Sequence, residues 1–215
     1  MKKVLYLGTD PTLFKEEGKD IYHCPLIEVK PRDVEHFQIK HQLEDLPLYT
    51  HLLLTSKHAV HLLIEGLLKL GFSKEILDDK IFVAIGESTA KALQHYSLNV
   101  SLTPKLSTQE GMMDLLDTID CEHAYFFYPR SSRARPTLSY YLRVRKLRHQ
   151  VCDLYDTQMK GKEYLPSLET FDEVIFTSPS TVEAFFSNFC SLPSHLQIKA
   201  IGPITQQALN LHLEL

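Results

Sequence analysis

The sequence predicts an α/β fold made of two similar parallel-sheet α/β domains, which are joined by a two-stranded connector, with one domain discontinuous in sequence. Three observations support this prediction. Short apolar segments alternate with helix-like segments, which is typical of parallel βαβ units. A two-part motif of the first half returns in the same order in the second half. Two strand-like segments with alternating polarity, 26–32 and 151–157, lie where the chain would cross between the domains.

Apart from the two alternating segments, the expected strands are apolar and are followed by residues that favour a turn or a helix start. In chain order, we expect strands at 2–7, 26–31, 52–54, 81–85, 98–102, 124–127 and 151–157. We expect helices after Thr9-Asp10-Pro11, after Thr55-Ser56 through residue 70, after Gly86, at 108–118 and after Arg130.

The repeated motif is the strongest evidence for a duplicated unit. LLLTSKHAV at 52–60 returns as VIFTSPSTV at 174–182, and VAIGESTAKAL at 83–93 matches KAIGPITQQAL at 199–209. The agreement in order and rough spacing predicts two domains that descend from one unit. After the second copy, the sequence has room only for a strand at 211–215. We therefore expect this domain to lack a terminal helix.

The domain boundaries follow from the two crossing segments. Residues 1–30 and 158–215 are expected to form the discontinuous domain, and residues 33–150 are expected to form the inserted domain. Residues 26–32 and 151–157 would pair as the connector.

Composition excludes several classes of protein. Of the 215 residues, 44% are hydrophobic. The net charge of −4 argues against a nucleic-acid binder. The apolar runs are too short to cross a membrane, and no signal-peptide pattern opens the chain, so we expect a cytoplasmic protein. His58 and His61 lack an acidic third partner, and we expect neither a metal site nor a cofactor. The cysteines form no CxxC pair and are expected to be reduced: Cys24, Cys121, Cys152 and Cys190.

Four strand-to-helix turns are candidate anion-binding sites. At such turns, free backbone N–H groups and the helix dipole attract negative charge. The candidate residues are Thr55, Ser56, Gly86, Thr89, Ser178, Ser180, Gly202 and Thr205. An alternative is that Ser56 and Ser178 only cap their helices. The turns lack the GxGxxG and GxxxxGK[ST] patterns, so no dinucleotide or nucleotide site is indicated, and they could line both walls of a cleft.

Two further residues are candidates because of their positions. Tyr128-Pro129-Arg130 directly follows the expected strand 124–127, so Arg130 is expected at a sheet edge where its guanidinium could bind a carboxylate. The other basic residues of that stretch could be an ordinary solvated helix face. Tyr155 lies on the expected connector, where a protonated hydroxyl could donate a hydrogen bond at neutral pH. An ordinary strand aromatic is the alternative.

Taken in order, the motifs TSKHAV, AIGESTAKAL, STQEGMMDLL, YPR, YDT, FTSPSTVEAF and AIGPITQQAL resemble the uroporphyrinogen-III synthase family over nearly the whole chain. The resemblance implies a cofactor-free, cyclising hydro-lyase of haem biosynthesis. Its substrate would be hydroxymethylbilane, a linear tetrapyrrole with eight carboxylates, and its product would be uroporphyrinogen III, with ring D inverted and water lost. A monomer, with a transient contact to the upstream bilane-forming enzyme, is expected.

The resemblance also implies roles for single residues. Tyr155 matches the family's connector tyrosine, which assists departure of the hydroxyl group. The positions that match substrate-contacting turns are Ser56, Thr89, Ser178, Ser180 and Thr205. Ile204 departs from the pattern, since the family often has a hydroxyl residue there. Two alternatives remain: a non-enzymatic two-domain binder that closes on an anionic ligand, and a nucleotide-dependent transferase, which the missing phosphate loops disfavour.

Overall fold

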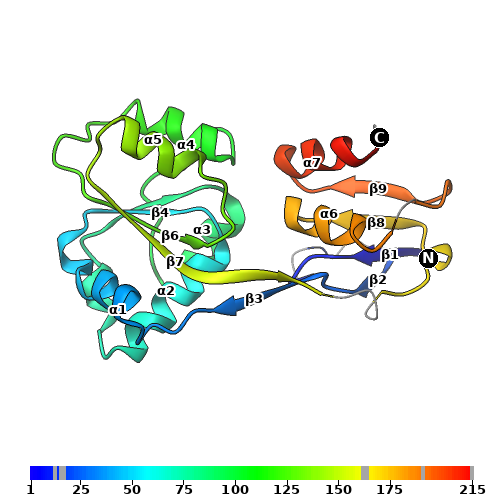
Figure 1. Cartoon of the computed structure of the whole chain (residues 1–215), viewed down its shortest axis with the longest axis horizontal. Helices are drawn as coiled ribbons and strands as arrows, with labels where there is room; N and C mark the ends of the chain where they lie inside the picture. The colour runs from blue at the N-terminus through cyan, green and yellow to red at the C-terminus, as the bar shows by residue number, and fades with distance from the viewer. Residues whose placement is uncertain (12–13, 15–17, 161–164, 190–191, 214–215) are drawn as a thin grey trace. The chain divides into compact units, whose positions relative to one another are not determined.

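The structure is a computed structural model that describes residues 1–11, 14, 18–160, 165–189 and 192–213. The chain divides into two compact units (Figure 1). Unit 1 comprises Met1–Val29 and Thr157–Leu215, and unit 2 comprises Lys30–Asp156. Unit 1 is therefore formed from two separate stretches of sequence, with unit 2 inserted between them.

Unit 2 is built on a parallel sheet. The described strands lie in the order β3-β7-β6-β4-β5, and the pairs β4–β5, β4–β6 and β6–β7 are parallel. Their bounds are β3 Ile27–Pro31, β4 His51–Leu54, β5 Ile81–Ala84, β6 Phe126–Ser131 and β7 His149–Met159. All four side chains of β4 are buried, as expected of a central parallel strand that is covered on both faces.

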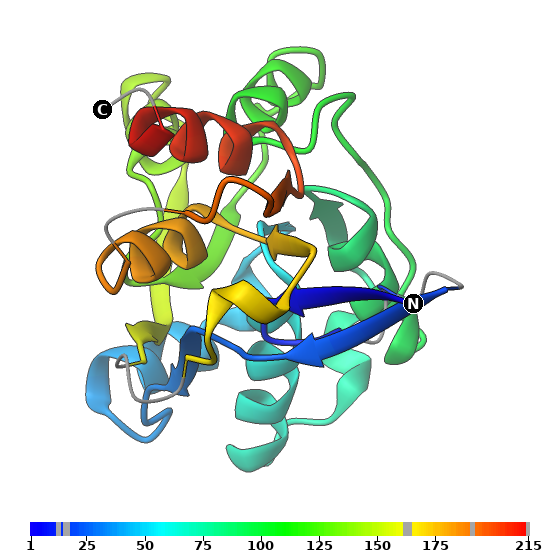
Figure 2. The ribbon, with the colours of Figure 1, turned by 90° about the vertical axis from the view of Figure 1, so that its right-hand side faces the viewer.

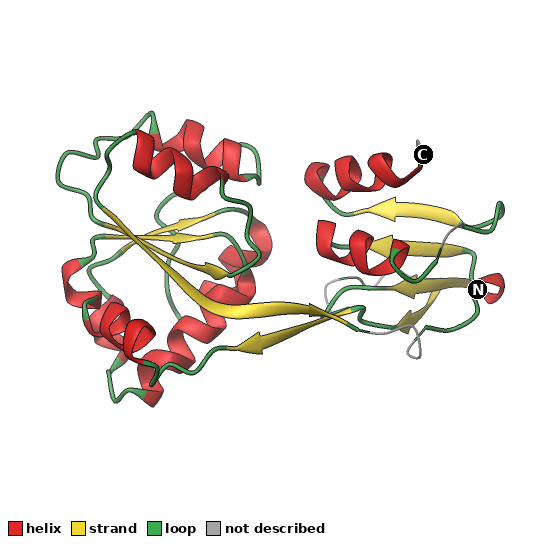
Figure 3. Ribbon diagram, viewed as in Figure 1, coloured by secondary structure: helices red, strands yellow, loops and turns green. Residues whose placement is uncertain are grey.

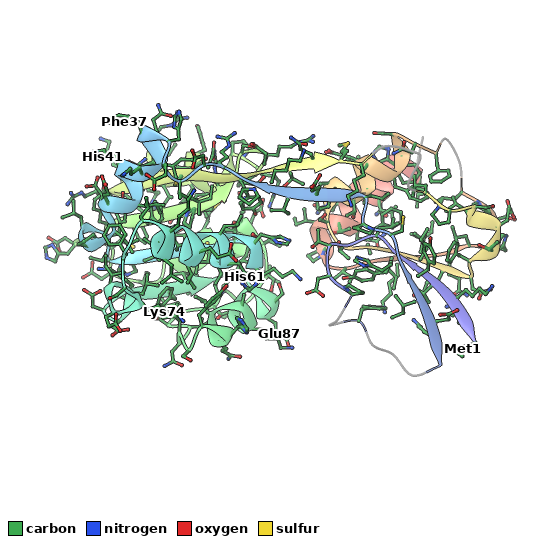
Figure 4. All side chains as sticks on the ribbon, turned by 90° about the horizontal axis from the view of Figure 1, so that it is seen from below. Met1, Phe37, His41, His61, Lys74 and Glu87 are labelled. Atoms are coloured by element: carbon green, nitrogen blue, oxygen red, sulfur yellow. The ribbon has the colours of Figure 1, made fainter. Side chains whose placement is uncertain are left out.

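The helices of unit 2 carry apolar faces that pack on this sheet. They are α1 Phe37–Glu44, α2 Lys57–Lys69, α3 Glu87–His95, α4 Gln109–Leu116 and α5 Thr137–Val144, with short 3₁₀ turns at Leu46–Leu48 and Lys74–Leu77. One core cluster joins Leu53 and Val83 of the sheet to Met112 of α4 and Leu138 of α5. Phe37, the first residue of α1, lies at the surface (Figure 4).

Unit 1 repeats this design with a smaller parallel sheet in the order β2-β1-β8-β9. Its strands are β1 Lys2–Tyr6, β2 Lys19–His23, β8 Glu173–Phe176 and β9 Gln197–Ala200. Its helices are α6 Pro179–Phe186 and α7 Pro203–Leu213, with a 3₁₀ turn at Leu168–Thr170. Figure 2, in which unit 1 faces the viewer, shows α6 and α7 side by side. Phe176, Val182, Phe185 and Leu209 lie in the core.

The strands β3 and β7 are neighbours and carry the chain between the units (Figure 3). Within unit 2, the Arg32 amide donates to the Leu154 carbonyl over 2.8 Å. Within unit 1, the Lys160 amide donates to the Leu26 carbonyl over 2.8 Å. With this pairing and the two parallel sheets, the α/β fold class predicted from the repeat is confirmed.

Several local expectations were wrong. Residues 211–213 belong to α7 and do not form a strand, since the helix that starts at Pro203 continues through them, while 214–215 lie outside the described residues. The expected strand at 98–102 is reduced to one bridge between Leu102 and Val83. Neither β2 nor α1 was expected from the sequence. The helix expected after Thr9-Asp10-Pro11 falls partly on 12–13 and 15–17, outside the described residues.

A buried carboxylate ties together the amino-terminal ends of the unit 1 strands. Glu173 is 4% exposed, and its carboxylate lies 2.7 Å from Lys2 Nζ and 3.1 Å from Lys19 Nζ. Lys2 Nζ also donates to Gln197 Oε1 over 2.6 Å. Burial alone would raise the pKa of Glu173, but the hydrogen bonds and charges of the two lysines lower it below its ordinary value.

We expect Glu173→Gln to lower the free energy of unfolding by roughly 1.5 kcal/mol at neutral pH, since a charge-assisted hydrogen bond is lost. The folded-state pKa of Glu173 is lowered, so its contribution is present above the unfolded pKa of about 4.3 and is lost as the pH falls through the folded value. Urea unfolding at pH 7 and at lower pH should show the difference between wild type and variant shrinking. Asp20→Asn, at an exposed residue of β2, is the control, and a difference that stays constant with pH would contradict the assignment.

Candidate functional site

The Thr55-Ser56 turn joins β4 to α2 at the carboxyl end of the unit 2 sheet. Ser56 is the N-cap of α2, and its Oγ accepts a hydrogen bond from the Ala59 amide over 3.1 Å. The same Oγ lies 2.7 Å from the Tyr155 hydroxyl, and either atom can donate. The capping role considered from the sequence is therefore real, but it is not the only contact of Ser56. The serine also ties β4 to β7.

Tyr155 is presented to Ser56 by an irregularity in β7. Arg130 and Ser131 are consecutive in β6, but their partners in β7 are Asp153 and Tyr155, so Leu154 is an extra residue. Such bulges re-aim side chains and are common beside functional sites. Tyr155 is 5% exposed, and burial raises its pKa above the ordinary value for tyrosine, although the Ser56 hydrogen bond acts in the opposite direction. The hydroxyl stays protonated at neutral pH and can donate.

A second buried tyrosine holds the other residue of the same turn. Thr55 Oγ1 donates to the Tyr128 hydroxyl over 3.5 Å, and Gln109 Nε2 donates to the same hydroxyl over 3.3 Å. Gln109 Oε1 in turn accepts from the Leu138 amide at the start of α5 over 3.0 Å. Burial raises the pKa of Tyr128. Sequence reasoning missed Tyr128 and Gln109, because both read as ordinary members of a strand and a helix.

The second turn of unit 2 places Thr89 inside the protein. Gly86 is the N-cap of α3, and a Cβ built on it would lie 2.6 Å from Ser107 Oγ, so only glycine fits without a shift. Thr89 is 1% exposed, and within the described residues its Oγ1 has no hydrogen-bond partner. A buried hydroxyl without a partner is costly. This cost is the kind that a functional position can carry.

The corresponding turns of unit 1 use their hydroxyls differently. Ser178 Oγ caps α6 by accepting from the Thr181 amide over 3.3 Å. In return, the Thr181 hydroxyl oxygen accepts from the Ser178 amide. Ser178 Oγ also lies 2.9 Å from Ser180 Oγ. Thr181 was not foreseen, although the S-x-x-T spacing of a capping box could have indicated it.

The last turn precedes α7. Gly202 has φ +86°, a left-handed backbone conformation that favours glycine. Thr205 is 3% exposed and is the third residue of α7, as Thr89 is the third residue of α3. Ile204, between Gly202 and Thr205, is partly buried. The register of the two copies seen in sequence is thus reproduced in the helices.

Arg130 lies elsewhere than its sequence position suggested. The strand does not end at residue 127 but continues through Ser131, so Arg130 is a strand residue. Its Nε donates to Asp153 Oδ1 over 2.9 Å, its NH1 donates to Ser139 Oγ over 3.3 Å, and the side chain is 17% exposed. Its guanidinium is committed to Asp153 as a cross-strand partner. Four other basic residues of this stretch are exposed, but only the first of them belongs to a helix, α5: Arg143, Arg145, Lys146 and Arg148.

The fold and these turns define an α/β protein of two parallel-sheet units with polar turns at the carboxyl ends of its strands. The same fold occurs in a mutant uroporphyrinogen III synthase from the bacterium Thermus thermophilus, with a TM-score of 0.68 and 20% identity, covering 99% of this chain and 89% of that one. No helix among the described residues is long and apolar enough to cross a membrane.

Sequence comparison identifies the family. The family model described as uroporphyrinogen-III synthase HemD matches residues 11–213. A relative from Methanothermobacter thermautotrophicus is 27% identical over 204 residues, which cover 88% of this chain and 79% of that protein. The uroporphyrinogen-III synthase of Chlorobaculum parvum is 25% identical over 197 residues, with 86% and 76% covered. The chain belongs to the uroporphyrinogen-III synthase family.

Proposed function

We propose that this chain is a cofactor-independent hydro-lyase that closes hydroxymethylbilane to uroporphyrinogen III in haem biosynthesis, acting in the cytoplasm as a monomer. The observation that carries the proposal is the Tyr155–Ser56 pair at the carboxyl end of the unit 2 sheet, in a chain of this family. The family membership favours this enzyme over a non-enzymatic binder of an anionic ligand. A transient contact with the upstream bilane-forming enzyme would hand over the substrate.

The turns fit a substrate that carries many carboxylates. Ser56 and Ser178 cap α2 and α6, and Gly86 and Gly202 precede α3 and α7. Helix N-termini offer backbone N–H groups and the positive end of the dipole to an anion. In the proposal, the substrate-binding residues are Thr55, Ser56, Gly86, Thr89, Ser178, Ser180, Gly202 and Thr205. Arg130 contributes only if its guanidinium leaves Asp153, so we assign it to holding β6 against β7.

Tyr155 assists the first chemical step. The terminal hydroxyl group of the substrate takes up a proton and departs as water, and an azafulvenium cation remains. When the Ser56 hydroxyl donates its hydrogen bond to the Tyr155 oxygen, the Tyr155 hydroxyl can donate its own hydrogen bond to the leaving hydroxyl group. The raised pKa keeps Tyr155 protonated at neutral pH, so its hydroxyl assists the departure by donating a hydrogen bond.

Orientation governs the later steps. The substituted carbon of ring D attacks the azafulvenium cation, a spiro intermediate forms and rearranges, and the macrocycle closes with loss of the proton that the first step took up. Because the substrate closes by itself in water, the protein mainly has to hold its ends. Well-oriented intramolecular reactions can gain about 7–11 kcal/mol. Many polar anchors with few acid–base groups are consistent with this task.

The rate of closure tests the proposal. Freshly made hydroxymethylbilane is mixed with the purified chain, with no added cofactor and with a chelator present, and its disappearance is compared with the spontaneous rate. We expect closure to be accelerated at catalytic concentrations of protein and to be insensitive to the chelator. Disappearance at the spontaneous rate, together with stoichiometric binding of the substrate, would instead favour the anion binder.

Thr89→Val tests whether the Thr89 hydroxyl, which has no hydrogen-bond partner among the described residues, serves the substrate. The variant keeps the shape and removes Oγ1, so we expect the free energy of unfolding to stay constant or rise by about 1 kcal/mol. We expect KM to rise roughly tenfold, the equivalent of one hydrogen bond. Urea unfolding and steady-state kinetics measure the two effects.

Thr181→Val is the matched control for stability, because Thr181 is also the third residue of its helix but its hydroxyl donates to the Ser178 carbonyl over 2.7 Å. This variant should be destabilised. If Thr89→Val were destabilised as much and KM stayed unchanged, Thr89 would be a structural residue only.

A further inference from the structure

Two side chains bind Asp156, the residue of β7 that follows Tyr155. The Arg32 guanidinium binds both carboxylate oxygens of Asp156, with Nε at 3.1 and 3.2 Å and NH2 at 2.8 Å. Ser132 Oγ donates to Asp156 Oδ1 over 2.5 Å. Arg32 comes directly after β3 and Ser132 directly after β6, the two strands on either side of β7. Both side chains meet at Asp156 of β7. We call Arg32, Ser132 and Asp156 the clamp.

The backbone of the same residues is held as well. The Arg32 amide donates to the Leu154 carbonyl over 2.8 Å, and the Ser132 amide donates to the Tyr155 carbonyl over 2.9 Å. Leu154 is the extra residue of the bulge, and a regular strand ladder would contain no such residue. The clamp therefore fixes the bulge from both sides, at the residue before Tyr155, at Tyr155 and at the residue after it.

The bulge decides where the Tyr155 side chain points. Side chains alternate between the faces of a strand, so an extra residue reverses the face for every residue that follows. The Ser56 contact of 2.7 Å depends on this reversal. A register that slipped back by one residue would carry the Tyr155 hydroxyl to the other face of the sheet.

We propose that Arg32, Ser132 and Asp156 are positioning residues that hold the Tyr155 hydroxyl against Ser56 during the reaction. The inference rests on the proposed role of Tyr155 and adds to it the residues that keep the tyrosine in place. The Arg32 and Asp156 side chains are 39% and 37% exposed, and an exposed ion pair contributes little to global stability. Small misplacements of a reacting group, in contrast, cost much in rate.

Kinetics of Asp156→Ala test the proposal. We expect kcat to fall about tenfold with KM within about twofold, since a misplaced group slows the chemical step more than it weakens binding. Asp156→Asn, which keeps an acceptor oxygen for Arg32 and Ser132, should recover most of the rate. Glu110→Ala is the matched control. Glu110, on α4 of the same unit, binds the Arg135 guanidinium through both carboxylate oxygens, at 2.7 and 2.9 Å, and this ion pair has a similar exposure. Glu110→Ala should leave kcat unchanged.

A double-mutant cycle shows whether the clamp acts through Tyr155. In a Tyr155→Phe background, Asp156→Ala should cause no further loss of kcat, because the group that it positions is gone. A full additional loss in that background, or an equal loss with Glu110→Ala, would overturn the proposal. Unchanged kinetics of Asp156→Ala with an active wild type would overturn it too.

Amide hydrogen exchange of the intact chain separates this inference from the proposed function. Even if the wild type does not accelerate closure, the Ser132 amide, which donates to the Tyr155 carbonyl, should exchange at least about tenfold faster in Asp156→Ala than in wild type. It should be unaffected in Glu110→Ala. Equal Ser132 exchange in wild type and Asp156→Ala would reject the clamp whatever the wild-type activity.

Discussion

Tyr155→Phe is expected to lower kcat by roughly 10²-fold, the low end of the range for general acid–base groups, while KM changes little. The phenyl ring keeps the packing of a side chain that is 5% exposed, and only the hydroxyl near Ser56 is removed. The loss stays moderate because the substrate can lose its hydroxyl group unaided. Steady-state kinetics with hydroxymethylbilane measure it.

Tyr141→Phe is the control for this variant. Tyr141 is 9% exposed, belongs to the same unit, and donates its hydroxyl to Asp117 over 2.8 Å at a distance in sequence from the turns. Its loss should affect stability and leave kcat unchanged. If Tyr155→Phe and Tyr141→Phe had the same kcat as wild type, Tyr155 would have no part in the reaction.

Phe185→Ala should have the largest effect on stability. Phe185 is fully buried in unit 1, with its ring 5.1 Å from that of Phe176 and 4.8 Å from that of Phe189. Truncating such a ring removes apolar burial and leaves a cavity, which costs roughly 3–5 kcal/mol. Since whole domains are stable by only about 5–15 kcal/mol, unit 1 should unfold at much lower urea concentration. Circular dichroism at increasing urea follows the change.

Phe37→Ala provides the comparison for this truncation. Phe37 lies on α1 at the surface and is 79% exposed (Figure 4). Its removal should change the free energy of unfolding by less than about 0.5 kcal/mol. A similar loss for both variants would mean that the unit 1 core is not organised around the phenylalanine cluster.

The fold could be predicted because its evidence is local and repeated. The strand, the TS turn and the helix of each copy follow one another within a few residues, and Ser56 and Ser178 cap α2 and α6. Hydrophobic periodicity and capping act over one or two turns of chain, so they can be read from a single sequence. The two elements that were missed are weakly patterned: β2 is largely exposed, and α1 has only two buried residues.

The contacts of the site could not be predicted, because they join residues distant in sequence. Ser56 and Tyr155 are 99 positions apart, and Arg32 and Asp156 are 124 positions apart. The bulge at Leu154 also broke the simple alternation expected for 151–157, which would place Leu154 and Asp156 on one face and Tyr155 on the other. Arg130 was misplaced because its partner Asp153 becomes a neighbour only once β6 and β7 pair.

The identity of the product isomer tests the central claim most directly. Wild-type protein and hydroxymethylbilane are reacted, the products are oxidised to porphyrins, and the type I and type III isomers are separated. If the chain holds the tetrapyrrole so that ring D inverts, type III should dominate and its share should rise with protein concentration. Type I alone, as formed by spontaneous closure, would contradict the account.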